Sequence, residues 1–337
     1  MKCYELQGTS GLDALKSAER QRPVVGPNQV LVRVHAASLN YRDVMIAGGG
    51  YARGVKLPLI PLSDGAGEIV ETGSAVARVK KGDRVCGTFF QRWIAGPSRP
   101  DIQEAALGGS ADGMLTEFAL LEGDGVVPVP EHFSYEEAAT LPCAALTAWH
   151  GLVVAGGVKP GDAVLLLGTG GVSIFGLQFA RLAGAQTIVV SSSDAKLARA
   201  RELGAAETIN SKSVPEWQDR VRAATGGRGV DHALDVTGGE TTAKSLAALG
   251  QAGHIAIIGA RSGPGGELDR RQILTKGLRV SGINVGSRAM FEAMNRAIAV
   301  ARLKPVVDRV FPFNEALAAY RDFATGSQFG KVVIRVD

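Results

Sequence analysis

The amino-acid sequence predicts an α/β protein that combines a doubly wound parallel sheet with a smaller, β-rich region. From about Tyr135 onward, apolar runs of strand length alternate with helical stretches, as in a parallel sheet covered by helices on both faces. Before that point, short strand-like segments such as Gln29–His35 follow one another between turns, without a βαβ layout. The 337 residues are sufficient for two hydrophobic cores.

The parallel sheet is expected from five apolar runs and two helical stripes. The runs span residues 163–167, 187–190, 232–236, 255–258 and 278–283. The stripes consist of Val172, Phe175, Phe179 and Leu182 in one helix and of Leu197, Ala200 and Leu203 in the next. The second helix is expected to end at Gly204, because glycine readily adopts the left-handed conformation of a helix exit. A last strand over 331–336 is expected to rejoin the β-rich region, and the loop-like segment 91–114 is a candidate lid.

The composition limits the classes of function. The net charge is +4 and the pI about 9.0, but basic and acidic residues are interleaved, so no nucleic-acid face is expected. No apolar run approaches the roughly 20 residues of a membrane span, and the N-terminus lacks the apolar stretch of a signal peptide, which predicts a soluble, cytoplasmic protein without a membrane partner. Three cysteines without a C-x-x-C pair argue against a disulfide framework and a structural metal cage.

A glycine-rich loop follows the first buried strand of the parallel sheet and leads into a helix. This context predicts a dinucleotide site, since glycines permit the tight turn and the close approach of the pyrophosphate to the helix N-terminus. The third glycine of the usual fingerprint is replaced by Ser173, whose hydroxyl must fit where the helix packs on the strand. The predicted cofactor-binding residues of this loop are Gly168, Thr169, Gly170, Gly171, Val172 and Ser173.

The end of the second strand indicates which nicotinamide cofactor is used. NAD enzymes usually place a carboxylate there for the ribose 2′-hydroxyl, whereas this chain has Ser191, Ser192 and Ser193, followed by Lys196. The absence of an acid and the presence of a nearby cation favour NADP(H), which carries a 2′-phosphate, over NAD(H). An alternative is that Ser193 is only a helix N-cap, and both interpretations can hold together.

Several motifs together resemble those of medium-chain dehydrogenase/reductases, in particular the zinc-free quinone-oxidoreductase-like and alcohol-dehydrogenase-like branch. These motifs span residues 40–43, 65–73, 141–148, the loop at 168 and residues 329–334. The resemblance implies a GroES-like, β-rich substrate domain over 1–130 and 292–337 and a Rossmann-type cofactor domain over 131–291. It also implies a homodimer formed through the last Rossmann strand, at about 280–285.

The resemblance further implies that a catalytic zinc ion is absent. Zinc-dependent relatives have a cysteine at the position of Asn40 and a histidine at that of Ser63; their third ligand matches Cys143 and a neighbouring acid matches Asp64. Catalytic zinc needs three good protein ligands, and two candidates remain. Cys143 is therefore expected to be a small, buried residue.

Without a metal, hydrogen-bond donors must stabilise the charge that develops on the substrate oxygen. Tyr41 is the first candidate as donor or general acid, followed by Asn40, Thr147 and Ser63, and Asp43 is expected to orient its neighbours. Tyr41 and Asp43 could instead only stabilise a loop. The resemblance assigns Lys331 to the pyrophosphate, whereas a lone lysine in a terminal strand is otherwise usually solvated. The remaining cofactor candidates are Thr237, Gly259 and Asn284.

The predicted function is hydride transfer between NADP(H) and a small activated C=C or C=O compound, such as a quinone, enone, enoyl thioester or aldehyde. Two alternatives stay open, an NAD-using alcohol dehydrogenase and an NADPH-binding protein that is non-catalytic or binds nucleic acid. Hydrolysis is set aside because the chain has no G-x-S-x-G elbow and no H-E-x-x-H helix.

Overall fold

The computed structural model describes residues 1–51, 54–259 and 268–336. The chain divides into two compact units. Met1–Leu146 and Gly286–Asp337 form the first, here called the β-rich unit, and Thr147–Val285 form the second, here called the parallel-sheet unit. Residues 131–146 and 286–291, which the sequence analysis assigned to the cofactor domain, thus group with the β-rich unit.

The parallel-sheet unit is built on six parallel strands in the order β10-β9-β8-β11-β12-β13. Numbered along the chain, this order is 3-2-1-4-5-6, that of the Rossmann fold. The doubly wound parallel sheet is therefore confirmed. The strands are β8 (Ala163–Leu167), β9 (Gln186–Ser191), β10 (Glu207–Asn210), β11 (Val230–Asp235), β12 (Leu249–Ile257) and β13 (Arg279–Gly282).

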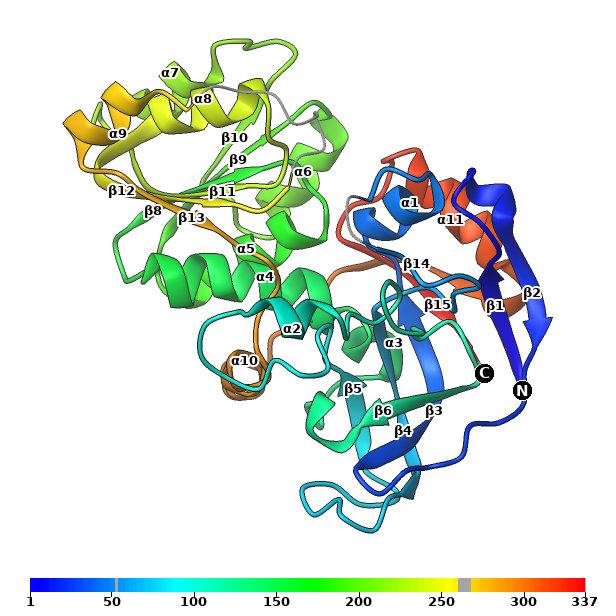
Figure 1. Ribbon diagram of the computed structural model, residues 1–337. Helices are drawn as coiled ribbons and strands as arrows, with labels where there is room; N and C mark the ends of the chain where they lie inside the picture. The colour runs from blue at the N-terminus through cyan, green and yellow to red at the C-terminus, as the bar shows by residue number, and fades with distance from the viewer. Residues whose placement is uncertain (52–53, 260–267, 337) are drawn as a thin grey trace. The chain divides into compact units, whose positions relative to one another are not determined.

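Helices cover both faces of this sheet, with α8 and α9 on one face and α5 on the other (Figure 1). All five residues of β8 are buried, as expected for a central strand with helices on either side. The helices are α5 (Gly171–Leu182), α6 (Asp194–Glu202), α7 (Trp217–Ala224), α8 (Glu240–Ala248) and α9 (Arg270–Lys276).

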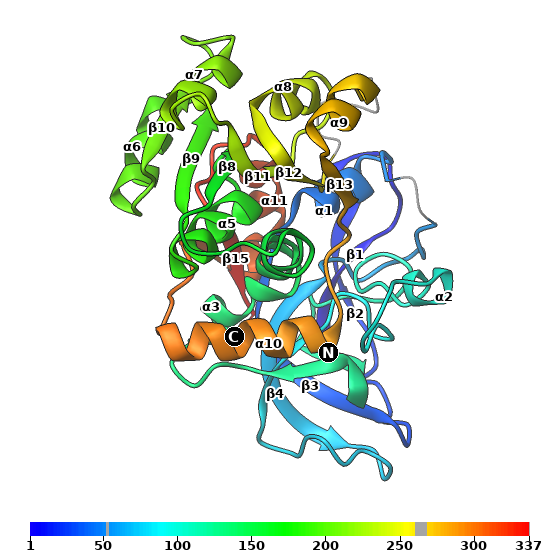
Figure 2. The same ribbon diagram turned by 90° about the vertical axis from the view of Figure 1, so that its left-hand side faces the viewer.

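The β-rich unit contains a seven-stranded mixed sheet and a two-stranded sheet formed by β1 and β2. The path of the larger sheet is β14-β15-β3-β4-β5-β7, with β6 paired to β3. The long strands β3 and β4 run side by side in both views (Figure 1 and Figure 2), and their register shifts twice, which bends the pair. The strands are β1 (Lys2–Leu6), β2 (Leu15–Glu19), β3 (Gln29–Ser38), β4 (Asp64–Thr72), β5 (Arg84–Gly87), β6 (Phe118–Glu122), β7 (Val126–Pro128), β14 (Val307–Pro312) and β15 (Lys331–Arg335).

Helices α1 and α11 of the β-rich unit contribute side chains to its hydrophobic core. In α10, Phe291, Met294 and Ile298 are buried at helical spacing, and Ser287 caps the N-terminus by accepting a hydrogen bond from the Met290 amide. The last strand, β15, pairs with β3, so the expected return of the chain to this region is confirmed. The helices are α1 (Tyr41–Ala47), α2 (Pro100–Gln103), α3 (Tyr135–Ala138), α10 (Arg288–Ala301) and α11 (Ala316–Ala324).

One helical segment, Tyr135–Gly156, is long and apolar enough to cross a membrane, by length and composition alone. It comprises α3, a π-helical turn over Leu141–Ala145, α4 (Leu146–Trp149) and a second π-helical turn. Because 67% of its most apolar window is buried, it matches the core helix of a soluble protein equally well. The individual apolar runs of the sequence had not indicated this segment.

Two details of the predicted elements are wrong. Leu182, assigned to the buried stripe of α5, is 44% exposed, while Ile174 and Leu177 are buried instead. Strand β10 was not predicted, since four residues with the sequence Glu-Thr-Ile-Asn give little apolar signal.

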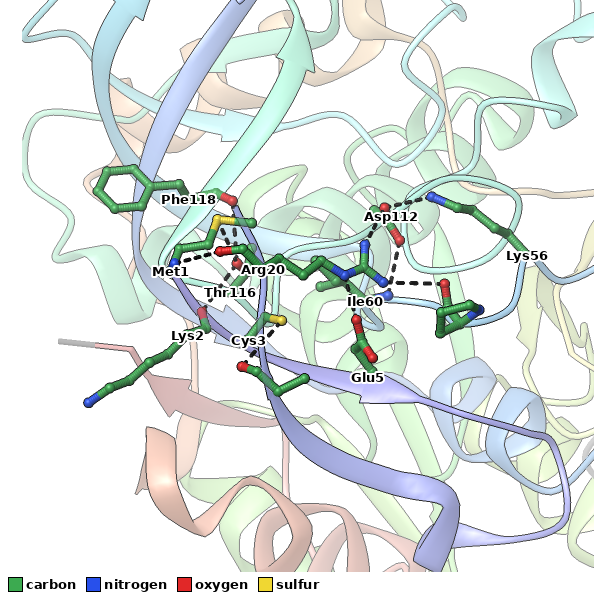
Figure 3. A network of polar contacts seen from close by, with 12 residues as sticks. Met1, Lys2, Cys3, Glu5, Arg20, Lys56, Ile60, Asp112, Thr116 and Phe118 are labelled. Carbon is green, nitrogen blue, oxygen red and sulfur yellow. Dashed lines mark hydrogen bonds and ion pairs between the residues drawn. The ribbon is translucent and has the colours of Figure 1, made fainter. Parts of the chain in front are cut away.

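A polar network joins the N-terminal strands of the β-rich unit to the segment before β6 (Figure 3). The guanidinium of Arg20 donates to the carboxylates of Glu5 and Asp112, and Asp112 also accepts from Lys56 Nζ at 2.6 Å and from the Ile60 amide at 3.1 Å. A cavity of about 470 Å³ opens beside this network, and residues of the segment 91–114 line part of its wall. None of the predicted site residues lines this cavity.

Candidate active site

The glycine loop after β8 leaves open space where a ligand can approach the backbone. Gly168 has a φ of +75°, and no heavy atom lies within 4 Å of a Cβ built on Gly168 or Gly170. Helix α5 begins after Gly170 without a side-chain cap, so the amides of its first turn have no side-chain acceptor at the cap. This arrangement fits a dinucleotide pyrophosphate.

Ser173 fits the position at which the fingerprint usually has glycine. It is 2% exposed, and its hydroxyl donates to the carbonyl of Leu167 at 2.6 Å. The hydroxyl is thus satisfied by the strand against which the helix packs. Thr169, Gly171 and Val172 complete the loop and the first residues of α5.

The fold gathers the other predicted cofactor residues at the same edge of the sheet. Ser191 ends β9, Thr237 and Gly259 come after β11 and β12, and Asn284 comes after β13. Because all six strands are parallel, their carboxyl ends share one edge, which is where open α/β sheets bind ligands.

Asp235, which the sequence analysis missed, holds the loop that carries Thr237. Its buried carboxylate accepts from the amides of Thr237 and Gly238, both at 3.0 Å, and from the Thr242 hydroxyl at 2.6 Å. The only signal in the sequence was an acid at the end of a buried strand, followed by Thr and Gly.

The end of β9 carries no carboxylate in the region expected to face the ribose. Ser193 is the N-cap of α6 and accepts from the Lys196 amide at 3.5 Å, so the capping interpretation of Ser193 holds. The carboxylate of Asp194, in the first turn of α6, accepts from Asn210 Nδ2 at 2.8 Å. Ser192 is exposed beside them.

A second polar group is buried in the β-rich unit around Lys331. This lysine is 2% exposed, so the interpretation as a solvated surface residue is wrong. Its Nζ donates to the carbonyl of Leu39 at 2.8 Å, to Asn40 Oδ1 at 2.7 Å and to Asp64 Oδ2 at 3.4 Å. Strand β15 supplies the lysine, the end of β3 leads into Asn40, and β4 begins at Asp64, so strand pairing assembles the group.

Asp64 is the acceptor shared by the surrounding donors. Its Oδ1 accepts from the Ser63 hydroxyl at 2.8 Å, and its Oδ2 accepts from the Cys143 amide at 3.3 Å. Ser63 and Asp64 are both fully buried. Ser38, another residue that the sequence did not reveal, lies opposite Asp64 in the β3–β4 pair.

Asp43 lies beside this group and fixes the backbone of Asn40. Its Oδ2 accepts from the Asn40 amide at 2.7 Å, and its Oδ1 finds no donor among the described residues. Burial raises the pKa of Asp43 to about 7, against the opposing influence of the Arg42 guanidinium. The expected orienting role of Asp43 thus has a structural basis at Asn40.

The remaining predicted catalytic residues are not all part of this group. Tyr41, the first residue of α1, is 43% exposed, in contrast to Asn40 at 8%. Thr147 is buried in α4 and belongs to the parallel-sheet unit. Cys143 was expected to be a small, buried residue, and it is only partly buried.

The donor set around Asp64 does not fit a catalytic zinc ion. Across 1–51, 54–259 and 268–336, no group of three or more His, Cys, Asp or Glu side chains could hold a metal ion. Asn40 and Ser63, which the sequence resemblance matches to zinc-ligand positions, are neutral oxygen donors, which suit zinc poorly. Desolvation, reinforced by the Asp64 carboxylate, raises the pKa of the Cys143 thiol in the metal-free protein.

Known proteins share both units of this chain. Residues 26–131 match the model of the alcohol dehydrogenase GroES-like domain, and residues 171–300 match that of the zinc-binding dehydrogenase. A zinc-type alcohol dehydrogenase-like protein of Schizosaccharomyces pombe is 43% identical over 97% of both chains. The quinone oxidoreductase of Mus musculus is 29% identical over 93% of this chain and 90% of its own.

A solved structure of an NAD-dependent alcohol dehydrogenase has the same fold, with a TM-score of 0.90 and 32% identity over the full length of both chains. The Rossmann-type sheet, the GroES-like unit and these relatives agree with one another. The chain therefore belongs to the medium-chain dehydrogenase/reductase superfamily, and it is a nicotinamide-dependent oxidoreductase of that family.

Proposed function

We propose that this protein transfers hydride between NADP(H) and a small activated C=C or C=O substrate without a zinc ion. The substrate class comprises quinones, enones, enoyl thioesters and aldehydes. The observation that carries the proposal is the buried Lys331 ammonium, which contacts Asn40 and Asp64. The sequence resemblance matches Asn40 to a zinc-ligand position and Asp64 to a neighbouring acid.

The parallel-sheet unit supplies the proposed cofactor site. The open turn at Gly168 and Gly170 supports binding of the pyrophosphate, and the first-turn amides of α5 favour its negative charge. The absence of a carboxylate at Ser191, together with Lys196, supports a preference for the 2′-phosphate. When bound, NADPH supplies the hydride.

The β-rich unit supplies the proposed stabilisation of charge. As hydride reaches the substrate, negative charge develops on its oxygen, and fixed hydrogen-bond donors stabilise that charge. Asn40 and Tyr41 are the candidate donors, and Asp43 holds the Asn40 backbone in place.

A homodimer is proposed through strand β13. This strand lies at one edge of the six-stranded sheet, and its backbone groups on that side have no partner strand within the described part of the unit. Val280 in β13 is 37% exposed, so an apolar side chain on this edge strand is accessible.

The experiment is to follow NADPH and NADH oxidation against quinones, enones, enoyl thioesters and aldehydes. NADPH-dependent reduction of one of these classes is the expected result. The 32% identity to an NAD-dependent alcohol dehydrogenase favours a second candidate, NAD-linked alcohol oxidation. Turnover of alcohols with NAD and none of the panel with NADPH would favour that candidate.

A further inference from the structure

The hydrogen bond from Lys331 determines which way the Asn40 amide faces. An ammonium group has three donors and no acceptor, so the atom that it contacts at 2.7 Å must be an acceptor. The amide oxygen of Asn40 therefore faces Lys331. The reverse orientation would bring two donors together next to a buried positive charge, so the assignment follows from the chemistry of the two groups.

This orientation leaves the amide nitrogen of Asn40 without a partner. Asn40 is 8% exposed, and its Nδ2 has less than 1 Å² of accessible surface and no acceptor among the described residues. A buried donor without an acceptor is costly, which explains why most buried polar groups are paired. A ligand acceptor reaches Nδ2 only when the neighbouring side chains shift, and its hydrogen bond would then remove this cost.

We propose that Lys331 is a positioning residue that orients the Asn40 amide so that Nδ2 donates to the reacting oxygen of the substrate. This inference rests on the proposed function. It assigns the role of principal donor to Asn40 instead of Tyr41, and it gives Lys331 a role in the β-rich unit that differs from contact with the pyrophosphate.

Four hydrogen bonds hold the donor in place before a substrate binds. The Asn40 backbone amide donates to Asp43 Oδ2, its side-chain oxygen accepts from Lys331, and Lys331 itself is held by the Leu39 carbonyl and the Asp64 carboxylate. Fixed donors of this kind need no reorganisation when charge develops, and removal of one commonly lowers kcat by about 10²- to 10³-fold.

The charges of the group explain why Lys331 must be replaced together with Asp64. Lys331 alone to methionine would leave the fully buried Asp64 carboxylate without its cation, which destabilises a protein regardless of catalysis. The pair Lys331→Met/Asp64→Asn removes one positive and one negative charge together. Asn40→Leu removes the donor. Because Asn40 also forms a capping box with Asp43 at the start of α1, the unfolding free energy of this variant is measured beside its kcat.

The kinetic experiment is a double-mutant cycle with the best substrate of the panel. Asn40→Leu should lower kcat by about 10²- to 10³-fold without changing the Kd of NADPH. The Lys331→Met/Asp64→Asn pair should lower kcat by a similar factor in the wild-type background and by no more than roughly 2-fold in the Asn40→Leu background. If the losses of kcat caused by Asn40→Leu and by the Lys331→Met/Asp64→Asn pair multiplied in the combined variant, the proposal would be overturned. A loss of kcat in Tyr41→Phe but not in Asn40→Leu would also overturn it.

An independent experiment observes the amide itself in the cofactor-free protein. In protein labelled with ¹⁵N-asparagine, the Asn40 side-chain resonances are those that disappear in Asn40→Leu. They should be one sharp pair in the wild type and broadened or doubled in the Lys331→Met/Asp64→Asn variant, because both orientations become accessible. An unchanged sharp pair in that variant would overturn the positioning role.

Arg335→Met is the matched control for both experiments. Arg335 lies on the same strand, but its side chain is 57% exposed and pairs with Glu136, so its loss should leave the amide resonances and kcat unchanged. Absence of turnover on the whole panel would contradict the proposed function and the donation to substrate. The resonances would still decide whether Lys331 orients the amide.

Discussion

Asp43 carries a buried carboxylate whose ionisation falls near neutral pH. Four charged or titratable groups surround it, Arg42 beside it in α1, Asp64 from β4, Lys331 from β15 and Tyr320 from α11. An unfolded aspartate ionises at about pH 4, whereas the pKa of Asp43 in the folded protein is about 7. Between these values the folded protein retains a proton that the unfolded chain has lost.

The sign of the resulting pH dependence follows from this difference. The contribution of Asp43 to stability is fully present below about pH 4 and is lost as the pH rises through about 7. Asp43→Asn cannot ionise and retains an oxygen for the Asn40 amide. We therefore expect the stability of the variant, relative to wild type, to increase between about pH 4 and about pH 8.

Urea unfolding at several pH values measures this effect. Asp101→Asn, at an exposed carboxylate paired with Arg99, serves as the control. Its unfolding free energy should change with pH in parallel with that of the wild type. A constant difference between Asp43→Asn and wild type across the range would show that Asp43 titrates as an ordinary carboxylate.

Ser191 is the residue at which cofactor choice is expected to change. Ser191→Asp introduces the carboxylate that binds the ribose hydroxyls of NAD and repels a 2′-phosphate. Loss of the charge-assisted contact to Lys196 is worth about 1.5 to 3 kcal/mol, or roughly 10- to 150-fold in the Kd of NADPH. Fluorescence titration with both cofactors measures it, with Ser213→Asp as an exposed control of the same charge.

In the wild-type protein, NADPH should bind more tightly than NADH. Equal dissociation constants for the two cofactors would remove the basis for an NADP preference. An effect of Ser213→Asp as large as that of Ser191→Asp would show that general charge repulsion, and not contact with the ribose, governs binding.

At the scale of structural elements, Asp112 joins three segments of the β-rich unit (Figure 3). It accepts from Arg20 and Lys56 and from the Ile60 amide. Asp112→Asn keeps one oxygen but loses the charge, and because the groups are partly exposed we expect a loss of about 1 to 2 kcal/mol in unfolding free energy. Chemical denaturation measures it. A change below about 0.5 kcal/mol, as expected for an isolated surface pair, would show that the network adds little.

Elements with strong periodic signals were predictable, and those defined by their neighbours were not. The five residues of β8 matched the predicted run, because a central parallel strand is apolar throughout. Strand β10 escaped prediction because its pairing with β9, rather than its composition, makes it a strand. Leu182 was assigned to the core because it continues the stripe, but it lies at the end of α5 and is exposed.

The same difference applies to the candidate site. The glycine loop was predictable, since strand, turn and helix are adjacent in the sequence. The group around Lys331 depends on the pairing of β15 with β3, which brings together residues 291 positions apart. The burial of Lys331 and the place of Ser38 opposite Asp64 follow from strand pairing, and the hold of Asp235 on the next loop follows from local hydrogen bonds. The identity of a single residue reveals neither.

At the scale of the whole molecule, the two units contribute different parts of the proposed reaction. The parallel-sheet unit offers an open glycine turn with helix amides, which suits a dinucleotide. The β-rich unit offers a buried group in which an ammonium contacts Asn40 and Asp64. In the proposed reaction, hydrogen-bond donors of this second group, and not a metal ion, stabilise the charge that develops on the substrate.

The most direct test of this claim is elemental analysis of protein purified without added metal, combined with activity before and after prolonged chelation. Far less than one zinc ion per chain and unchanged NADPH-dependent turnover are expected, because Asn40 and Ser63 are poor zinc ligands. Near-stoichiometric zinc, with activity lost on chelation and restored by zinc, would contradict it.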